Sequence, residues 1–374
     1  MRIGVLTLPF NNNYGGILQA YALMTILKRD GHDVELIYRR HNKLSNVHIL
    51  KSLLKNVLKL LIGKKIKHII PNHEKELQRK GKLMSYFADK YISPKSSPLF
   101  STKELSRYVK GRFEIIIVGS DQIWRPDYVP NIEEFYLTFL DDASVRRIAY
   151  AASFGSDAPK YTPQEKESCG KSLSKFNLVT VREQSGIEII RRFGWKCYDP
   201  KVVLDPTLLL KKEDYCLLIQ DQPYNTTRKL FCYLLDDSSA TQRTVEIVAS
   251  QSGEKPYYII DVTKWKGSDY VMPPIEDWIS GIRDAELVVT DSFHGMVFSI
   301  IFNKPFLVCV NEDRGATRIK SLLDMLELSC RMVSTYDEKK IDKLLNSPIN
   351  WNVVNEKIDF YREESLMLLK SQLK

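Results

Sequence analysis

The sequence has no long hydrophobic run, no paired cysteines and few histidines. No run reaches the ~18 apolar residues that a membrane-spanning helix needs, and the opening MRIGVLTL is too short for a secretory signal. The six cysteines are widely spaced without a CxxC pair. This spacing favours reduced thiols over disulfides. We therefore expect a cytoplasmic protein.

Signature motifs of several enzyme classes are also missing. The chain contains no GxSxG nucleophile elbow, no P-loop and no zinc-ligand spacing. The glycine turn after the first predicted strand is not GxGxxG, and Tyr38 at the end of the second is followed by arginines instead of an acidic residue. Dinucleotide binding and hydrolysis by a triad are therefore poorly supported, and we expect no metal site.

The net charge of +9 is concentrated in one segment. From Lys43 to Lys82 there are eleven basic residues, ten of them lysines, against two glutamates, which accounts for the whole excess. Apolar residues at helical spacing lie beside a row of Lys51, Lys55 and Lys59, the pattern of an amphipathic basic helix. We expect contact with an anionic membrane surface; the alternative is a solvated helix packed on the domain. The segment lacks the aromatic residues and arginines of base readout, so we expect no nucleic acid partner.

The rest of the chain alternates strand and helix patterns, which is typical of parallel α/β sheets. At about 100–200 residues per domain, 374 residues predict two domains. We place the boundary near Pro206, giving domains 1–206, with a basic insertion at about 43–82, and 207–374. A helix over Val353–Leu369 is expected to cross back onto the first domain. Two such Rossmann-like domains would face each other across a cleft.

The stretch from Ala285 to Phe302 is the most informative. It reads as a strand, a polar turn and then His294 at the start of an apolar helix. Ligands of open parallel sheets bind at the carboxyl ends of strands, and a helix N-terminus there favours an anion. We expect His294 to bind a phosphate or move a proton, with Ser292 and Gly295 in the same site. The alternative is a histidine that only hydrogen-bonds inside a packed turn.

Two polar turns of the first domain suit a sugar. In the first, Asn12, Asn13, Tyr14 and Gly15 lie between a strand and its helix, where asparagines bond hydroxyls and glycine lets the backbone approach a ligand. In the second, Asp121, Gln122 and Trp124 follow a predicted strand and supply a carboxylate, an amide and an aromatic face. The alternatives are a turn that simply needs glycine, and a helix cap with Trp124 in the core.

Arginines complete the predicted cleft. Arg182 directly follows the predicted strand Leu178–Val181, and its guanidinium suits bidentate contact with carboxylate or phosphate. The alternative is a surface pair with Glu183. Arg314 and Arg318 follow a strand of the second domain and are expected to face the same cleft. One histidine, several arginines and sugar-type residues favour transfer from an anionic donor.

Taken together, these motifs resemble the polysaccharide pyruvyl transferase family. The matching elements run in order from the first strand to about Leu326, and the basic segment after Arg39 is the least matched part. They are IGVLTLPFNNNYGGILQAYAL, VGSDQIW, YAASFG, VREQSG, VVLDPTLL and VVTDSFHGMVFSIIFNKPF.

The resemblance implies a GT-B-like fold and transfer of the enolpyruvyl carbons of phosphoenolpyruvate onto a sugar as a ketal, with release of phosphate. It implies that His294 and Arg182 contact the donor; we assign Ser292, Gly295, Arg314 and Arg318 to it as well. His294 would supply a proton, and Asp121 would act as a base or orient a hydroxyl. The donor-side domain is then 207–374 and the acceptor-side domain 1–206.

Phosphoenolpyruvate would be a substrate, so no cofactor is expected. The expected acceptor is galactose, as a 4,6-ketal, in a surface polysaccharide precursor linked to polyprenyl diphosphate. This predicts a peripheral protein at the inner membrane face, with Lys51, Lys55 and Lys59 at the lipid. The alternatives are a GT-B nucleotide-sugar glycosyltransferase and a non-catalytic glycan-binding protein.

Overall fold

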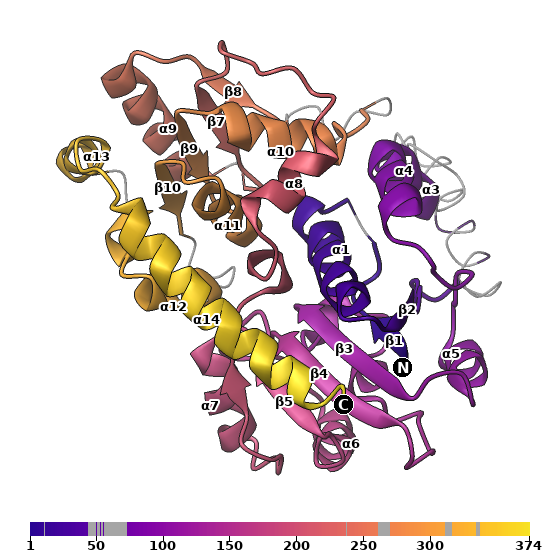
Figure 1. Cartoon of the computed structure of the whole chain (residues 1–374). Helices are drawn as coiled ribbons and strands as arrows, with labels where there is room; N and C mark the ends of the chain where they lie inside the picture. Colours follow the sequence, from indigo (N-terminus) through magenta and orange to yellow (C-terminus); the bar gives the residue numbers. More distant parts are fainter. Residues whose placement is uncertain are drawn as a thin grey trace.

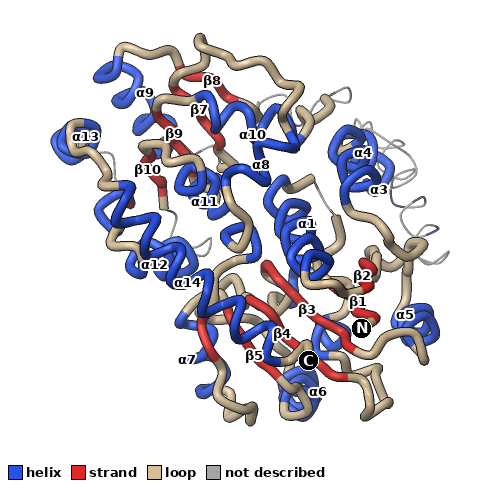
Figure 2. Tube along the Cα trace, in the orientation of Figure 1, coloured by secondary structure: helices blue, strands red, loops and turns tan. Residues whose placement is uncertain are grey.

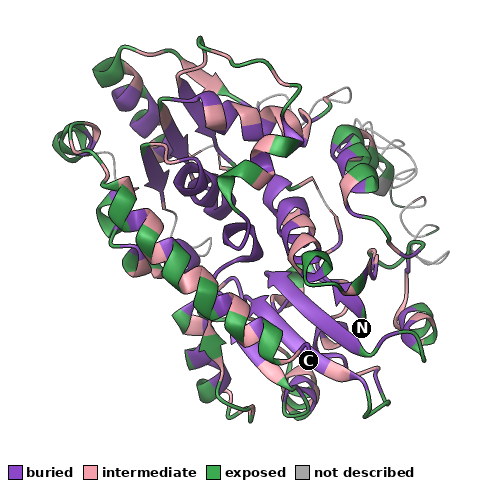
Figure 3. Cartoon of the chain, viewed as in Figure 1, coloured by how far each residue is buried: buried purple, intermediate pink, exposed green. Residues whose placement is uncertain are grey.

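The computed structural model describes residues 1–10, 12–43, 50, 53, 55, 73–236, 238–260, 270–310, 316–333 and 337–374. Within these ranges the chain forms two parallel sheets, each covered by helices (Figures 1 and 2). The sheets are buried almost throughout (Figure 3). The predicted architecture of two Rossmann-like domains is confirmed.

The first sheet has the strand order β2-β1-β3-β4-β5-β6, and all of its pairs are parallel. Its longest strands are near-continuous apolar runs because helices cover both faces. The strands are β1 (Arg2–Leu6), β2 (Asp33–Leu36), β3 (Ile115–Asp121), β4 (Arg146–Ala152), β5 (Leu178–Val181) and β6 (Lys201–Val202). The helices are α1 (Tyr14–Arg29), α3 (His73–Lys80), α4 (Lys82–Tyr91), α5 (Thr102–Val109), α6 (Pro163–Leu173) and α7 (Gln184–Arg192), with short 3-10 turns η1 (Pro126–Tyr128) and η2 (Ile132–Tyr136).

The second sheet has the order β11-β10-β9-β7-β8 and is also parallel. Its strands are β7 (Leu230–Tyr233), β8 (Pro256–Tyr258), β9 (Leu287–Thr290), β10 (Phe306–Cys309) and β11 (Met332–Val333). Its helices are α9 (Ser239–Ser252), α10 (Ile275–Asp284), α11 (Phe293–Ile301), α12 (Ala316–Met325) and α13 (Glu338–Leu345), with the turn η5 (Ser329–Arg331). The first sheet connects to the second through η3 (Pro206–Leu208) and α8 (Lys212–Leu218), and the boundary expected near Pro206 falls in this connection.

One of the hydrophobic cores spans both domains. Tyr14, at the start of α1, inserts into the second domain, where its ring stacks on Trp278 with centroids 5.4 Å apart. Its hydroxyl donates to the carbonyl of Pro273 at 2.8 Å. A single cluster of buried apolar side chains runs from the first sheet through α1 into the second domain. The start of α1 is therefore held by both domains.

The C-terminal helix α14 (Trp351–Ser371) crosses from the second domain onto the first, as drawn in yellow in Figure 1. Its Ser365 Oγ accepts a hydrogen bond from the backbone N–H of Leu204 at 3.1 Å. Arg362 Nε donates to the carbonyl of Leu208 at 2.8 Å. After the helix, the carbonyl of Gln372 accepts from Arg146 at 2.6 Å. These contacts tie α14 to the connection between the domains and to β4.

The basic insertion is partly described. Lys55 is helical and exposed, while Lys51 and Lys59 lie outside the described residues. Beyond them, α4 packs against α1 and against α10 of the second domain, and α3 packs against α4. The carbonyl of Lys80 accepts from the backbone N–H of Met272 at 2.8 Å. Among the described residues, we find no helix with the length and apolar character needed to cross a membrane. The six cysteines, all of them described, are free thiols in the structure.

Candidate functional site

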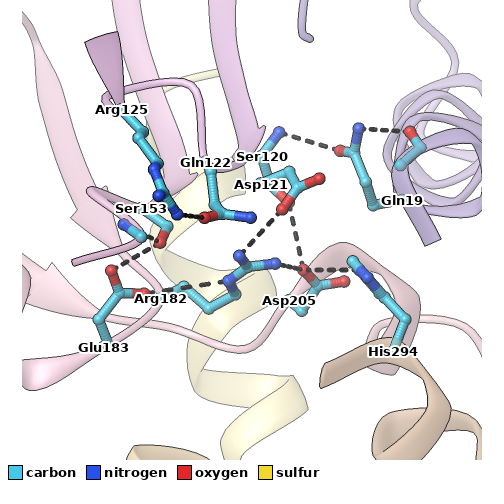
Figure 4. Close-up of polar contacts among 12 residues, drawn as sticks. Gln19, Ser120, Asp121, Gln122, Arg125, Ser153, Arg182, Glu183, Asp205 and His294 are labelled. Atoms are coloured by element: carbon cyan, nitrogen blue, oxygen red, sulfur yellow. Dashed lines mark hydrogen bonds and ion pairs between the residues drawn. The ribbon is translucent and has the colours of Figure 1, made fainter. Parts of the chain in front are cut away.

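Polar side chains from both domains meet where the carboxyl ends of the first sheet face the start of α11 (Figure 4). Asp121 ends β3, Arg182 and Glu183 follow β5, and Asp205 follows β6. His294 lies in the first turn of α11. Parallel strands bring their carboxyl ends to one edge of a sheet, so residues far apart in sequence gather here.

Arg182 is the hub of this site. Its Nη1 donates to Asp205 Oδ2 at 2.8 Å, and its Nη2 donates to Asp121 Oδ1 at 3.1 Å. Its Nε lies 3.9 Å from Glu183 Oε2, and its guanidinium lies 4.4 Å from the ring centroid of Phe293. All three charged partners are buried. Arg182 is thus a buried bridge between two strand ends, and neither Glu183 alone nor the solvent is its partner.

Asp205 links this hub to the second domain. Its Oδ1 accepts from the backbone N–H and hydroxyl of Thr207, at 3.0 and 2.7 Å. Its Oδ2 accepts from Ser120 Oγ at 3.3 Å as well as from Arg182. The same oxygen lies 3.7 Å from His294 Nε2, an ion-pair distance too long for a hydrogen bond.

His294 is buried and tightly enclosed. A Cβ added at Gly15 would lie 2.0 Å from its Nδ1 and 2.1 Å from its Cγ, so only glycine fits there. The Nδ1 side of the ring therefore rests on α1 of the first domain, and the Nε2 side faces Asp205. Gly15, expected to approach a ligand, instead approaches the histidine.

The charges of the site set its protonation. Burial alone disfavours ionised Asp121, but Arg182, His294 and Arg318 outweigh it and lower the pKa of that carboxyl. The pKa of Asp205 is also lowered, against burial, by His294, Arg182 and Thr207. Burial raises the pKa of Glu183 despite the nearby Arg182. The charges around Arg182 thus favour the ionised form of Asp121 and Asp205, whereas burial acts against ionisation of Glu183.

Four buried polar atoms of this site have no hydrogen-bond partner: His294 Nε2, Asp121 Oδ2, Arg182 Nε and Glu183 Oε2. Buried polar groups are nearly always paired, because leaving one unpaired costs about 1–3 kcal/mol. A packed protein core does not usually leave so many hydrogen-bond donors and acceptors unpaired on four neighbouring residues. It is what we expect of a site whose missing partners come from a bound polar molecule.

The other donor-side residues differ in their roles. Ser292 caps α11 by accepting from the backbone N–H of Gly295 at 3.4 Å, and a Cβ at Gly295 would lie 2.3 Å from Thr290 Oγ1. Both therefore shape the turn that presents His294. Arg318 is buried beside Phe293, at 5.9 Å from its ring centroid, and burial together with Arg182 lowers its pKa to about 10. Arg314 lies outside the described residues.

Two of the expected sugar-binding residues belong to the core. Trp124 is fully buried, stacked on Tyr136 with centroids 5.0 Å apart, and its indole N–H donates to a backbone carbonyl. Tyr14 fills the domain interface. Neither ring has a free face, so the expectation that they bind an acceptor is corrected to a packing role.

The remaining acceptor candidates, Asn12, Asn13 and Gln122, make contacts within the protein. Asn13 is exposed and caps α1 through the backbone N–H of Gly16 at 3.2 Å. Asn12 packs on the chain at Gly81, since a Cβ there would lie 2.0 Å from its Oδ1. Gln122 accepts from Arg125 Nη1 at 3.2 Å (Figure 4). The contact of Asn12 with Gly81 places the end of the basic insertion beside the turn formed by Asn12 and Asn13, which we call the asparagine turn.

Asp205, Glu183 and Ser120 were not predicted as site residues. Asp205 is the polar residue in the apolar stretch VVLDPTLL, and Ser120 precedes Asp121 in VGSDQIW. The signal for each was a polar residue at the end of a strand. The sequence alone did not reveal that three such strand ends share one arginine.

Two solved structures with similar folds are described as UDP-N-acetylglucosamine 2-epimerases. A putative UDP-N-acetylglucosamine 2-epimerase from Listeria monocytogenes has a TM-score of 0.56 at 12% identity, covering 100% of this chain and 97% of that one. The UDP-GlcNAc 2-epimerase from Neisseria meningitidis bound to UDP-GlcNAc has a TM-score of 0.52 at 8% identity, covering 100% and 99%. At such low identity these likenesses show the GT-B-like fold alone.

The search of curated proteins found no match. The family model for polysaccharide pyruvyl transferase, in contrast, matches residues 13–313. That span includes Asp121, Arg182, Asp205 and His294. The chain therefore belongs to the polysaccharide pyruvyl transferase family.

Proposed function

We propose that this protein transfers the enolpyruvyl group of phosphoenolpyruvate onto two hydroxyls of a sugar and releases phosphate. Membership of the family makes it a pyruvyltransferase. The observation that supports the proposed donor is the pair of unsatisfied nitrogens in this cluster, Arg182 Nε and His294 Nε2. Phosphoenolpyruvate offers phosphate and carboxylate oxygens to the donors of that cluster.

The residues divide the chemistry between them. Arg182 has both terminal nitrogens bound to carboxylates, so it meets the donor through Nε, and Arg318 adds positive charge beside it. His294, through Nε2, delivers a proton to the methylene carbon of the donor or stabilises the leaving phosphate. The methylene becomes a methyl group and leaves an oxocarbenium-like carbon.

Two additions and one departure complete the transfer. One sugar hydroxyl adds to the central carbon, the bond from that carbon to the phosphate oxygen breaks, and the second hydroxyl adds to close the ketal. Each hydroxyl loses its proton: one replaces the proton given by His294, and the other goes to the departing phosphate, which leaves as hydrogen phosphate. Asp121 Oδ2, which has no partner in this site, is the acceptor that orients an incoming hydroxyl.

We further propose that the acceptor is a polyprenyl-diphosphate-linked saccharide, probed first as a galactose 4,6-diol. Asn12 lies against Gly81 at the end of the basic insertion, and we infer that the lipid carrier of a bound sugar extends toward this insertion. Lys51, Lys55 and Lys59 would then meet anionic headgroups at the inner membrane face. Co-sedimentation with anionic liposomes tests this part, comparing the protein with a variant in which these three lysines are glutamines.

Phosphate release tests the proposed reaction. The protein is incubated with phosphoenolpyruvate and a panel of aryl and lipid-linked glycosides, and a parallel set receives sugar nucleotides. We expect phosphate release only when both phosphoenolpyruvate and a suitable diol are present. Nucleotide release from a sugar nucleotide would instead indicate a glycosyltransferase, and sugar binding without turnover of either donor would indicate a glycan-binding protein.

A further inference from the structure

Asp205 is more firmly fixed than any other carboxylate of the site. Thr207 holds its Oδ1 with two hydrogen bonds, at 3.0 and 2.7 Å. The residue is 1% exposed, so its carboxylate has no room to turn. Its other oxygen, Oδ2, therefore points to one place, where it meets Arg182, Ser120 and His294.

The imidazole of His294 is confined between two parts of the first domain. Gly15 of α1 covers its Nδ1 side, and Asp205 faces its Nε2 at 3.7 Å. His294 itself belongs to α11 of the second domain. A negatively charged oxygen opposite Nε2 favours the tautomer that carries its hydrogen there.

We propose that Asp205 is a positioning residue that fixes the orientation and tautomer of His294 across the domain interface. The inference rests on the proposed function, in which Nε2 is the atom that serves the donor. Through the same oxygen, Asp205 sets the distance between His294 and Arg182, the two groups that would hold opposite ends of one small donor. Geometry of this kind matters because a displacement of ~1 Å at reacting groups costs on the order of 10²-fold in rate.

The competing interpretation is purely structural: Asp205 caps the turn η3 and pairs with Arg182. Asp205→Asn distinguishes the positioning role from this structural role, since the amide keeps an oxygen that Thr207 can hydrogen-bond but removes the negative charge opposite His294. Asp284→Asn is the matched control. Asp284 is also buried, pairs with Arg283 at 3.0 Å and accepts a backbone N–H at 2.9 Å, but it lies outside the site.

The first readout needs no substrate. In uniformly nitrogen-15-labelled protein, the ring nitrogens of the six histidines are observed by NMR, and His294 is assigned by its loss in His294→Ala. We expect one Nε2–H tautomer in the wild type, a shift of the His294 signals toward a tautomer mixture in Asp205→Asn, and wild-type signals in Asp284→Asn. Unchanged His294 signals in a folded Asp205→Asn protein overturn the proposal.

The second readout is kinetic. We expect Asp205→Asn to lower kcat ~10²-fold with a small change in the KM for phosphoenolpyruvate, and Asp284→Asn to keep the kcat of the wild type. In the double variant with His294→Ala, the Asp205 substitution should cost little more, because it acts through the missing ring. Equal losses of kcat with and without His294 overturn the proposal. A wild type that transfers nothing refutes the proposed function, while the NMR result still decides the role of Asp205.

If Asp205→Asn fails to fold, Thr207→Val tests the same question, namely whether Asp205 orients His294. It keeps the carboxylate but removes the hydroxyl that holds Oδ1 at 2.7 Å. We expect the His294 signals to shift in the same direction as the Asp205 charge loosens. Signals identical to those of the wild type overturn the proposal by this route as well.

Discussion

Two adjacent glycines at the start of α1 give opposite predictions for the same substitution. A Cβ at Gly15 would lie 2.0 Å from Nδ1 and 2.5 Å from Cβ of His294, closer than side chains ever approach. A Cβ at Gly16 would lie 3.5 Å or more from its nearest neighbours, an ordinary contact with Asn13. The two variants differ by one position and by nothing else in composition.

Gly15→Ala must move the imidazole or α1. Overpacking of this kind costs about 1–3 kcal/mol of unfolding free energy, and moving His294 by ~1 Å costs on the order of 10²-fold in kcat. Gly16→Ala is expected to be neutral or to stabilise the helix by about 0.5 kcal/mol, because alanine favours helical backbone over glycine. It should keep the kcat of the wild type.

Urea unfolding gives the stability change for each variant, and phosphate release from phosphoenolpyruvate with an active glycoside gives kcat. Both assays are run on the same preparations, so a loss of folded protein is corrected before rates are compared. If Gly15→Ala is as active as Gly16→Ala, the close packing of α1 on His294 has no bearing on catalysis, and the reasoning is refuted.

Three further predictions concern buried charges. Glu134→Gln should lower the free energy of unfolding, measured in urea, by about 3 kcal/mol. It breaks a bidentate ion pair with Arg39, at 2.7 and 2.9 Å, whose two side chains are both 0% exposed. A loss of unfolding free energy below about 1 kcal/mol would contradict this. Burial raises the pKa of Asp291 to about 6, so the carboxyl binds a proton more strongly in the folded protein than in the unfolded chain. The melting temperature of the wild type, relative to that of Asp291→Asn, should therefore rise as the pH falls from 6 to 4. A difference in melting temperature that stays constant over this pH range contradicts the prediction. Arg182→Lys should lower both the melting temperature and kcat, since an ammonium cannot bridge Asp121 and Asp205 in one plane. Thermal melts and the transfer assay check this. Unchanged values of both would show that the site does not depend on the guanidinium of Arg182.

Much of the fold was predictable because its signals are local. Runs such as Ile115 to Val118 are buried on both faces, and apolar runs separated by helical patterns are typical of parallel sheets. The exact ends of elements depend on contacts that such patterns do not show. The first helix begins at Tyr14 because the Asn13 side chain caps it.

The site was partly predictable for the same reason. Polar residues at the ends of strands pointed to Asp121, Arg182 and His294, and the structure brings these three together. Partner choice could not be derived from spacing, since it depends on how two sheets face each other. For that reason Asp205 was missed, and Trp124 was expected at a sugar when its apolar surface is buried in the core.

The transfer itself is tested most directly by isotopic label. The protein is incubated with carbon-labelled phosphoenolpyruvate and the glycoside that gives the fastest phosphate release, and the glycoside is then analysed by mass spectrometry. We predict a glycoside that carries the labelled pyruvyl group as a ketal, with one phosphate released for each group transferred, and label transfer by His294→Ala that is slower by on the order of 10²-fold or more. Phosphate release without label on the sugar, or full label transfer by His294→Ala, would contradict the proposed mechanism.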